Sequence, residues 1–135
     1  MTVSVLDASV AVSALRANDV NHARAVSYLA PLLQGVDTIV VPTLFDVEVV
    51  ATLVRAGYPP ADARRAADLF VSRARMVTLG PRAARAASNT ASRTRLRTGD
   101  AVYVSVAQRE GLPLVTFDAE ILARAHMAGV TAVAP

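Results

Sequence analysis

Short apolar runs alternate along the chain with longer stretches in which apolar residues recur every three or four positions. The short runs predict strands at 2–6, 38–41, 76–79, 114–116 and 130–133. The longer stretches, rich in alanine and arginine, predict helices at 8–15, 21–33, 43–55, 60–75, 81–95, 99–110 and 119–128. Gly35, Gly111 and Gly129 each follow a predicted helix, where glycine readily takes the left-handed conformation that ends one.

The order of these elements predicts the fold class. The strands are almost wholly apolar and are separated by helices, which indicates a parallel sheet covered on both faces. We therefore expect an α/β protein with a three-layer α/β/α sandwich. The only candidate break, at 57–60, is too short to separate domains, so we expect one domain over residues 1–135.

The amino-acid composition limits the kinds of catalytic and binding chemistry that this chain can perform. The chain has no cysteine, no lysine and only two histidines, while its 14 arginines give a formal net charge of +3. Thiolate chemistry, Schiff bases, P-loops and the lysine-dependent receiver domains are therefore excluded, and carboxylate chemistry is left. The first residues lack the basic segment of a signal peptide, and no apolar run approaches the ~20 residues of a membrane span, so we expect a cytoplasmic protein without membrane contact.

Acidic residues follow the predicted strands. Asp7 comes directly after the first strand and Asp118 after the fourth, while Asp100 opens the helix that leads into the fourth. Ligands of open α/β sheets bind beyond the carboxyl ends of the strands. Taken one at a time, however, Asp7 and Asp118 have an alternative role as helix N-caps, and Asp100 as a first-turn acid favoured by the helix dipole.

Glu48 has no such alternative. It lies in a predicted helix that is apolar on most of its faces, where a carboxylate is costly unless it is paired or binds a metal. Asp46, by contrast, stands three residues after the expected cap Thr43, in the capping-box position. Asp7, Glu48, Asp100 and Asp118 together predict a cluster that needs a hard cation, Mg²⁺ or Mn²⁺, able to activate water against a phosphodiester.

Four segments then resemble, in order, the motifs of PIN-domain nucleases, specifically the short VapC-type toxins of bacterial toxin–antitoxin pairs. They are Val5-Leu-Asp-Ala-Ser-Val, Pro42-Thr-Leu-Phe-Asp-Val-Glu-Val, Gly99-Asp-Ala-Val-Tyr-Val-Ser-Val-Ala and Gly111-Leu-Pro-Leu-Val-Thr-Phe-Asp. The resemblance covers essentially the whole chain. It implies a five-stranded parallel sheet, Mg²⁺- or Mn²⁺-dependent endoribonuclease activity, a homodimer, and inhibition by a cognate VapB-type antitoxin.

The resemblance also assigns residues. It implies that Asp7, Glu48, Asp100 and Asp118 are the catalytic metal ligands. Ser9 and Thr116 match positions where such proteins often carry a hydroxyl lining the site, although a helix first-turn serine and a strand-end threonine are equally ordinary.

Arginines gather in one part of the chain. No acid occurs between Asp68 and Asp100, yet seven of the 14 arginines do. A basic surface around an acidic site suits a polyanion, so Arg93, Arg95 and Arg97, next to Asp100, are candidate RNA contacts. The alternative for such a run is a solvated helix face.

Other functions stay open at this point. A degenerate PIN module would bind RNA or a protein partner without cutting, but it would be expected to lack one or more of the acids. A haloacid-dehalogenase-type hydrolase needs a second aspartate two residues after the first, and this chain has Ser9 there. We therefore expect an active ribonuclease, with the catalytically weak binding module as the alternative.

Overall fold

The computed structural model describes all 135 residues, Met1–Pro135. Its centre is a five-stranded sheet in which every neighbouring pair is parallel, with the order β3-β2-β1-β4-β5. The strands are β1 (Val3–Leu6), β2 (Thr38–Pro42), β3 (Ala74–Val77), β4 (Leu114–Val115) and β5 (Ala132–Val133). The predicted five-stranded parallel sheet is confirmed.

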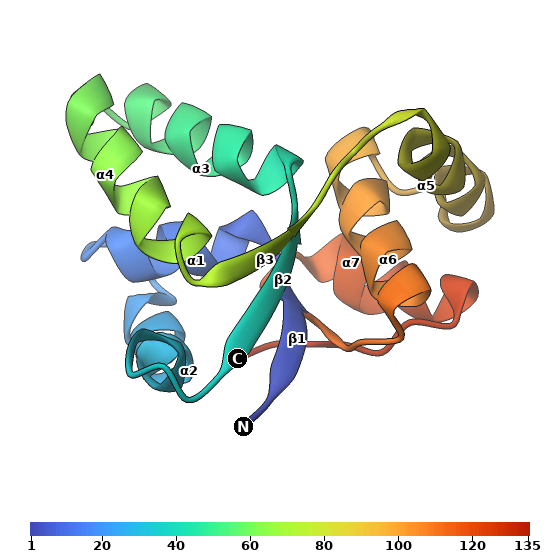
Figure 1. Cartoon of the computed structure of the whole chain (residues 1–135), viewed down its shortest axis with the longest axis horizontal. Helices are drawn as coiled ribbons and strands as arrows, with labels where there is room; N and C mark the ends of the chain where they lie inside the picture. Colours follow the sequence, from blue (N-terminus) through green and yellow to red (C-terminus); the bar gives the residue numbers. More distant parts are fainter.

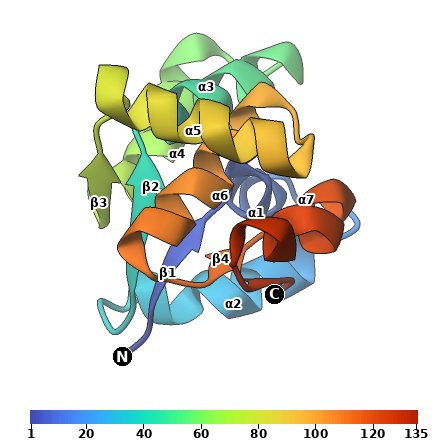
Figure 2. The same ribbon diagram turned by 90° about the vertical axis from the view of Figure 1, so that its right-hand side faces the viewer.

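Helices cover both faces of this sheet (Figure 1). On one side are α1 (Ala8–Leu15), α2 (His22–Leu33), α3 (Leu44–Arg55) and α4 (Pro60–Val71). On the other are α5 (Pro81–Thr94), α6 (Thr98–Glu110) and α7 (Ala119–Arg124), which continues into the 3₁₀ turn η1 (Ala125–Ala128). The view from the side shows α5 outermost, lying across α6 (Figure 2). The three-layer α/β/α arrangement is confirmed.

The burial of each helix follows its apolar pattern. Every residue from Ala101 to Ala107 in α6 is buried, since this helix packs on β1, β2 and β4 while α5 covers its outer side. In α5 only one stripe is buried, at the helical spacing of Ala83, Ala87, Thr90 and Thr94, and the remaining positions are exposed or half-buried. No helix is both long enough and apolar enough to cross a membrane.

One predicted pair of elements was misplaced. The expected helix 60–75 ends at Val71, and the expected strand 76–79 is β3, from Ala74 to Val77. The buried positions of α4 stop at Phe70, and Ala74 already pairs with Ile39 of β2. Pairing with β2 therefore wins over the good helix propensity of the segment.

The order of the strands creates a crevice. The chain runs outward from β1 to β2 and β3, and then returns to place β4 and β5 on the other side of β1. The connections after β1 and β4 thus diverge to opposite faces of the sheet, which is where open α/β sheets bind ligands. Asp7 N donates to Val115 O at 3.0 Å, so the ends of β1 and β4 are joined there.

Candidate active site

Asp7 lies at this crevice and is almost fully buried. It occupies the N-cap position of α1 but makes no capping hydrogen bond, so the capping alternative is wrong for this residue. Instead, its Oδ2 accepts from Ser9 Oγ and from Thr116 Oγ1, both at 2.7 Å. Burial raises the pKa of Asp7, the two hydroxyl groups act against that shift, and the charge of Asp118 adds to it.

Ser9 and Thr116 also tie the surrounding backbone together. Ser9 Oγ accepts from Phe117 N at 3.2 Å, and Thr116 Oγ1 accepts from Asp118 N at 2.9 Å. The two hydroxyls are 3.5 Å apart. Both residues suggested by the resemblance therefore contact Asp7 and fix the turn that carries Asp118.

Glu48 projects from α3 and is partly buried. Burial, with the charges of Asp7 and Asp100, raises its pKa to about 7, and the neighbouring Tyr103 hydroxyl acts in the opposite direction. Its Oε1 is buried without a hydrogen-bond partner. This supports the sequence argument that the helix offers Glu48 no partner.

Asp100 stands in the first turn of α6, and no side chain caps that helix. Burial raises its pKa to about 6, with further contributions from the charges of Asp118, Asp7 and Glu120, while Arg97 lowers it. The carboxylates thus repel one another across the crevice, as converging acids do in the absence of a cation.

Asp118 does serve as a helix N-cap, which is the alternative role that its position in the sequence predicts. Its Oδ1 accepts from Ile121 N at 2.9 Å at the start of α7. Its charge nevertheless raises the pKa of both Asp7 and Asp100, so it belongs to the same electrostatic neighbourhood.

A cavity of about 350 Å³ opens beside these residues. Three of the four predicted acids line it, namely Asp7, Glu48 and Asp100, but Asp118 does not. Two larger cavities, of about 410 Å³ beside Gly111 and Gly129 and about 490 Å³ beside Arg24 and Tyr28, contain no acidic side chain, so the acid-lined one is the candidate site.

The sequence analysis missed three polar residues of this cavity. Asp19, Ser13 and Thr52 also line it. Asp19 lies in the turn between α1 and α2 and accepts from Asn21 N at 2.8 Å, so its local pattern is that of an ordinary polar turn. Nothing in the sequence indicates that this turn folds back toward the acids.

The donor set suits a hard divalent cation in its chemistry. All four predicted ligands are carboxylates, Oε1 of Glu48 has no hydrogen-bond partner, and no arginine forms an ion pair with Glu48. No three acidic or histidine side chains form a ready-made group around one point. Because Mg²⁺ keeps several waters and binds through one or two carboxylates, the arrangement fits a hydrated ion rather than a fully protein-ligated one.

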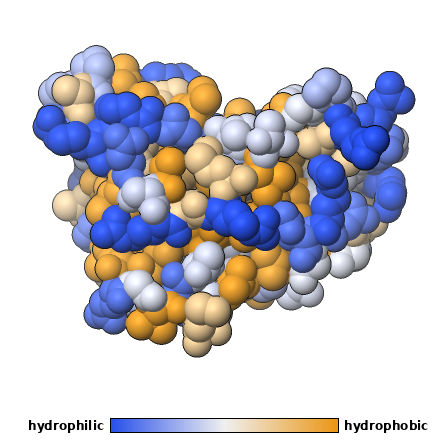
Figure 3. Space-filling view, in the orientation of Figure 1, coloured by the Kyte–Doolittle hydropathy of each residue, from blue (hydrophilic) through white to orange (hydrophobic).

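The three candidate RNA contacts are exposed and lie where α5 gives way to α6. None of Arg93, Arg95 and Arg97 takes part in an ion pair. Arg95 is the only non-glycine residue with a positive φ, at 58°, and its carbonyl accepts from Arg124 Nη1 at 3.2 Å. Hydrophilic side chains cover the neighbourhood of α5 on the right of Figure 3.

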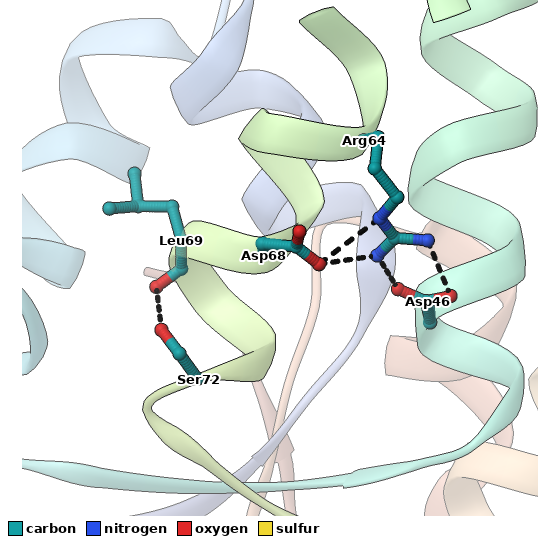
Figure 4. A network of polar contacts seen from close by, with 5 residues as sticks. All are labelled: Asp46, Arg64, Asp68, Leu69 and Ser72. Atoms are coloured by element: carbon teal, nitrogen blue, oxygen red, sulfur yellow. Dashed lines mark hydrogen bonds and ion pairs between the residues drawn. The ribbon is translucent and has the colours of Figure 1, made fainter. Parts of the chain in front are cut away.

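Asp46 has a different role from the one predicted. Thr43 makes no capping hydrogen bond, and its hydroxyl accepts from Leu79 N at 3.2 Å, so the capping box is wrong. Asp46 instead receives two hydrogen bonds from Arg64 of α4, which also bonds to Asp68 (Figure 4). Arg64 is 18 positions from Asp46 in the sequence, so the local pattern around Asp46 does not predict this contact.

Comparison with known proteins adds to the geometry. The PIN domain family model matches residues 4–126. No curated protein matches the sequence. The fold is shared with Mycobacterium tuberculosis VapC20, a toxin that cleaves the sarcin–ricin loop, at a TM-score of 0.74 and 20% identity, with 100% of both chains covered.

Two further solved structures have the same fold. VapBC2 from Rickettsia felis, bound to a DNA fragment of its promoter, gives a TM-score of 0.70 at 14% identity and covers 99% of this chain and 98% of its own. A toxin–antitoxin complex from Klebsiella pneumoniae gives 0.64 at 14% identity and covers 89% of this chain and 90% of its own. At these identities the similarity concerns the fold.

Proposed function

The chain belongs to the PIN domain family, and from that premise we propose that it is a Mg²⁺- or Mn²⁺-dependent endoribonuclease acting as the toxin of a toxin–antitoxin pair. The observation that carries the proposal is the acid-lined cavity at the crevice between β1 and β4. Asp7, Glu48 and Asp100 line it, and burial and mutual repulsion raise the pKa of all three. A divalent cation relieves this repulsion.

In this proposal Asp7, Glu48, Asp100 and Asp118 hold the hydrated ion, either directly or through its water molecules. A divalent ion held by these residues would supply activation of a water molecule and stabilisation of the charge that develops on the phosphodiester oxygens. Ser9 and Thr116 position Asp7 by donating to a single oxygen of its carboxylate. Asp118 keeps one oxygen on the backbone of α7, which fixes the orientation of the whole side chain.

The substrate is RNA, and the exposed arginines support this. Arg93, Arg95 and Arg97 are free of ion pairs and adjoin Asp100 in sequence. Arginine binds phosphate oxygens in a bidentate manner and keeps its charge at all physiological pH values. The positive charges of these arginines reduce the electrostatic repulsion between the acids and an RNA chain that approaches the cavity. The RNA is that of the cytoplasm.

A protein partner is the second part of the proposal. Val47, Ala51 and Val54 form an exposed apolar stripe along α3 at helical spacing, with Val47 60% exposed. One of the fold neighbours is a toxin–antitoxin complex. We therefore expect this protein to bind a VapB-type antitoxin and to form a homodimer, and co-purification followed by light scattering on a sizing column measures both.

The direct test is RNA cleavage by purified protein with Mg²⁺, Mn²⁺ or excess EDTA. Asp7→Asn, Glu48→Gln, Asp100→Asn and Asp118→Asn each remove most of the activity, because every anionic ligand is needed to place the metal. EDTA abolishes cleavage and added Mn²⁺ restores it. The matched control is Asp62→Asn, an exposed first-turn aspartate of α4, which retains activity.

Two results contradict the proposal. If RNA cleavage persists in excess EDTA, or if all four variants cleave RNA as well as the wild type, a metal-dependent nuclease at this site is excluded. Tight RNA or partner binding by the wild type without cleavage in either metal favours the alternative, a catalytically weak PIN module.

A further inference from the structure

In the whole chain, only two buried polar side-chain atoms lack a hydrogen-bond partner. They are Glu48 Oε1 and the hydroxyl oxygen of Tyr103. Buried polar groups are nearly always paired, so each such exception requires an explanation. That both belong to neighbouring residues beside the candidate site suggests one explanation for the two.

Tyr103 lies one helical turn after Asp100 in α6 and is completely buried in the core. A phenylalanine would fill the same space without burying a hydroxyl group. The groups that act on this hydroxyl are the carboxylates of Glu48 and Asp7 and the backbone amide of Ala8, none of them in full hydrogen-bond geometry. The hydroxyl therefore points to the acids from the interior side.

Glu48 reaches the same place from the other helical layer. Figure 1 shows α3, the helix that carries Glu48, and α6 on opposite sides of the sheet. A Cβ atom at Gly99 of α6 would lie 3.7 Å from Glu48 Oε2, so this carboxylate also packs against the start of α6. Its Oε1 is buried whereas Glu48 itself lines the cavity.

We infer that Tyr103 is a positioning residue for Glu48: when a divalent cation is bound, its hydroxyl donates to Oε1 and thereby leaves Oε2 facing the cavity, available to that cation. This inference rests on the proposed function. The partners are complementary, since an ionised carboxylate only accepts and a tyrosine hydroxyl donates. A neutral donor orients the carboxylate without cancelling the charge that the cation needs, which a lysine or arginine in its place would do. Partners of this kind commonly orient metal-binding carboxylates.

The test measures Mn²⁺ binding to the full-length protein without RNA. The loss of the electron paramagnetic resonance signal of free Mn²⁺ reports the binding. Tyr103→Phe weakens Mn²⁺ binding by roughly 10–100-fold, the usual effect of losing a partner of a metal ligand. In the Glu48→Gln background the same substitution changes binding by less than about 2-fold, because the side chain that Tyr103 positions is no longer a ligand. RNA cleavage by Tyr103→Phe recovers when Mn²⁺ is raised by the same factor.

The matched control is Tyr28→Phe, which removes another tyrosine hydroxyl, 3.3 Å from Ser4 Oγ and outside the cavity lining. It leaves Mn²⁺ binding unchanged. Circular dichroism and thermal melting in EDTA verify that both variants are folded.

Two outcomes overturn the inference, and a third separates it from the proposed function. Wild-type Mn²⁺ affinity in folded Tyr103→Phe refutes it, and so does an equal loss in the Glu48→Gln background, which would indicate a general effect on the core. If wild-type protein itself binds no Mn²⁺, the proposed metal site fails, and the inference that depends on it fails with it.

Discussion

Removing the charge of Asp100 is expected to stabilise the metal-free protein. Burial and the charges of Asp118, Asp7 and Glu120 raise the pKa of this carboxyl from 3.8 to about 6. An acid whose pKa is higher in the folded than in the unfolded chain binds its proton more tightly when folded. The contribution of Asp100 to stability is therefore most favourable below pH 4 and becomes less favourable as the pH rises toward 6. Above pH 6 the ionised carboxylate destabilises the fold by its full amount.

The size of the effect follows from this shift. A shift of about two pKa units corresponds to about 3 kcal/mol. Because Asp100 is only partly buried, solvent screening reduces the cost, and we take about 1–2 kcal/mol at pH 8. For a chain of this length, 1 kcal/mol shifts the melting temperature by roughly 4 °C, so Asp100→Asn should melt roughly 4–8 °C above the wild type in EDTA.

The assay is a set of thermal melts at pH 8 and at steps down to pH 4, with EDTA or with Mg²⁺. The advantage of Asp100→Asn shrinks as the pH falls through 6 and nearly vanishes near pH 4. Mg²⁺ at 100 times its dissociation constant stabilises the wild type by about 2.7 kcal/mol, and stabilises the variant much less because a ligand is missing.

Asp62→Asn is the matched control, since Asp62 is also a first-turn aspartate, in α4. There the substitution removes only a favourable interaction with the helix dipole and an ion pair with Arg65, so it lowers the melting temperature. If Asp100→Asn likewise melts below the wild type in EDTA at pH 8 and gains as much from Mg²⁺, Asp100 is a structural first-turn acid and the proposed site is wrong at that position.

Three further predictions concern the arginines. Replacing Arg93, Arg95 and Arg97 together by alanine should weaken RNA binding and lower the slope of log binding constant against log salt concentration by about 0.7 for each lost phosphate contact, whereas Arg65→Ala should change neither. Filter binding of catalytically inactive protein at several salt concentrations measures both quantities, and an unchanged slope would assign the three arginines to the solvated surface. Arg95→Gly should raise the thermal stability by about 0.5–1 kcal/mol, because glycine accepts the left-handed conformation without strain, while still weakening RNA binding; a lower melting temperature would contradict this. Arg64→Ala, which breaks the bridge between α3 and α4, should lower the melting temperature in dilute buffer and less so in 1 M NaCl; equal losses in both would mean that packing, rather than charge, is responsible.

Much of the fold could be predicted from local pattern. The helix α1 has its predicted bounds, and the positive φ angles of Gly35, Gly111 and Gly129 follow the predicted helix ends. Apolar strands and helical periodicity are properties of neighbouring residues, and burial on both faces of the sheet requires them. The cap formed by Asp118 is local in the same sense, since its acceptor and donor are three residues apart.

The candidate acids could also be found from the sequence, but their environment could not. That Asp7 and Asp118 follow strands is visible in the sequence, and a parallel sheet brings such positions to one edge. That Asp7 is held by Thr116, 109 residues away, depends on β4 lying next to β1. The raised pKa values depend on the same convergence.

Three features were decided by tertiary structure alone. Ala74 and Arg75, expected at the end of a helix, belong to β3 because β2 offers them partners, against their helical propensity. Asp46 took Arg64 in place of its own helix terminus. Asp19 reached the cavity because the turn between α1 and α2 folds over it. The sequence by itself determines the periodicity of the apolar positions and the glycines that end helices, because neighbours along the chain create them. Which distant groups meet, and therefore whether an acid caps its own helix or contacts another element, is determined only when the sheet orders its strands and the helices pack on it.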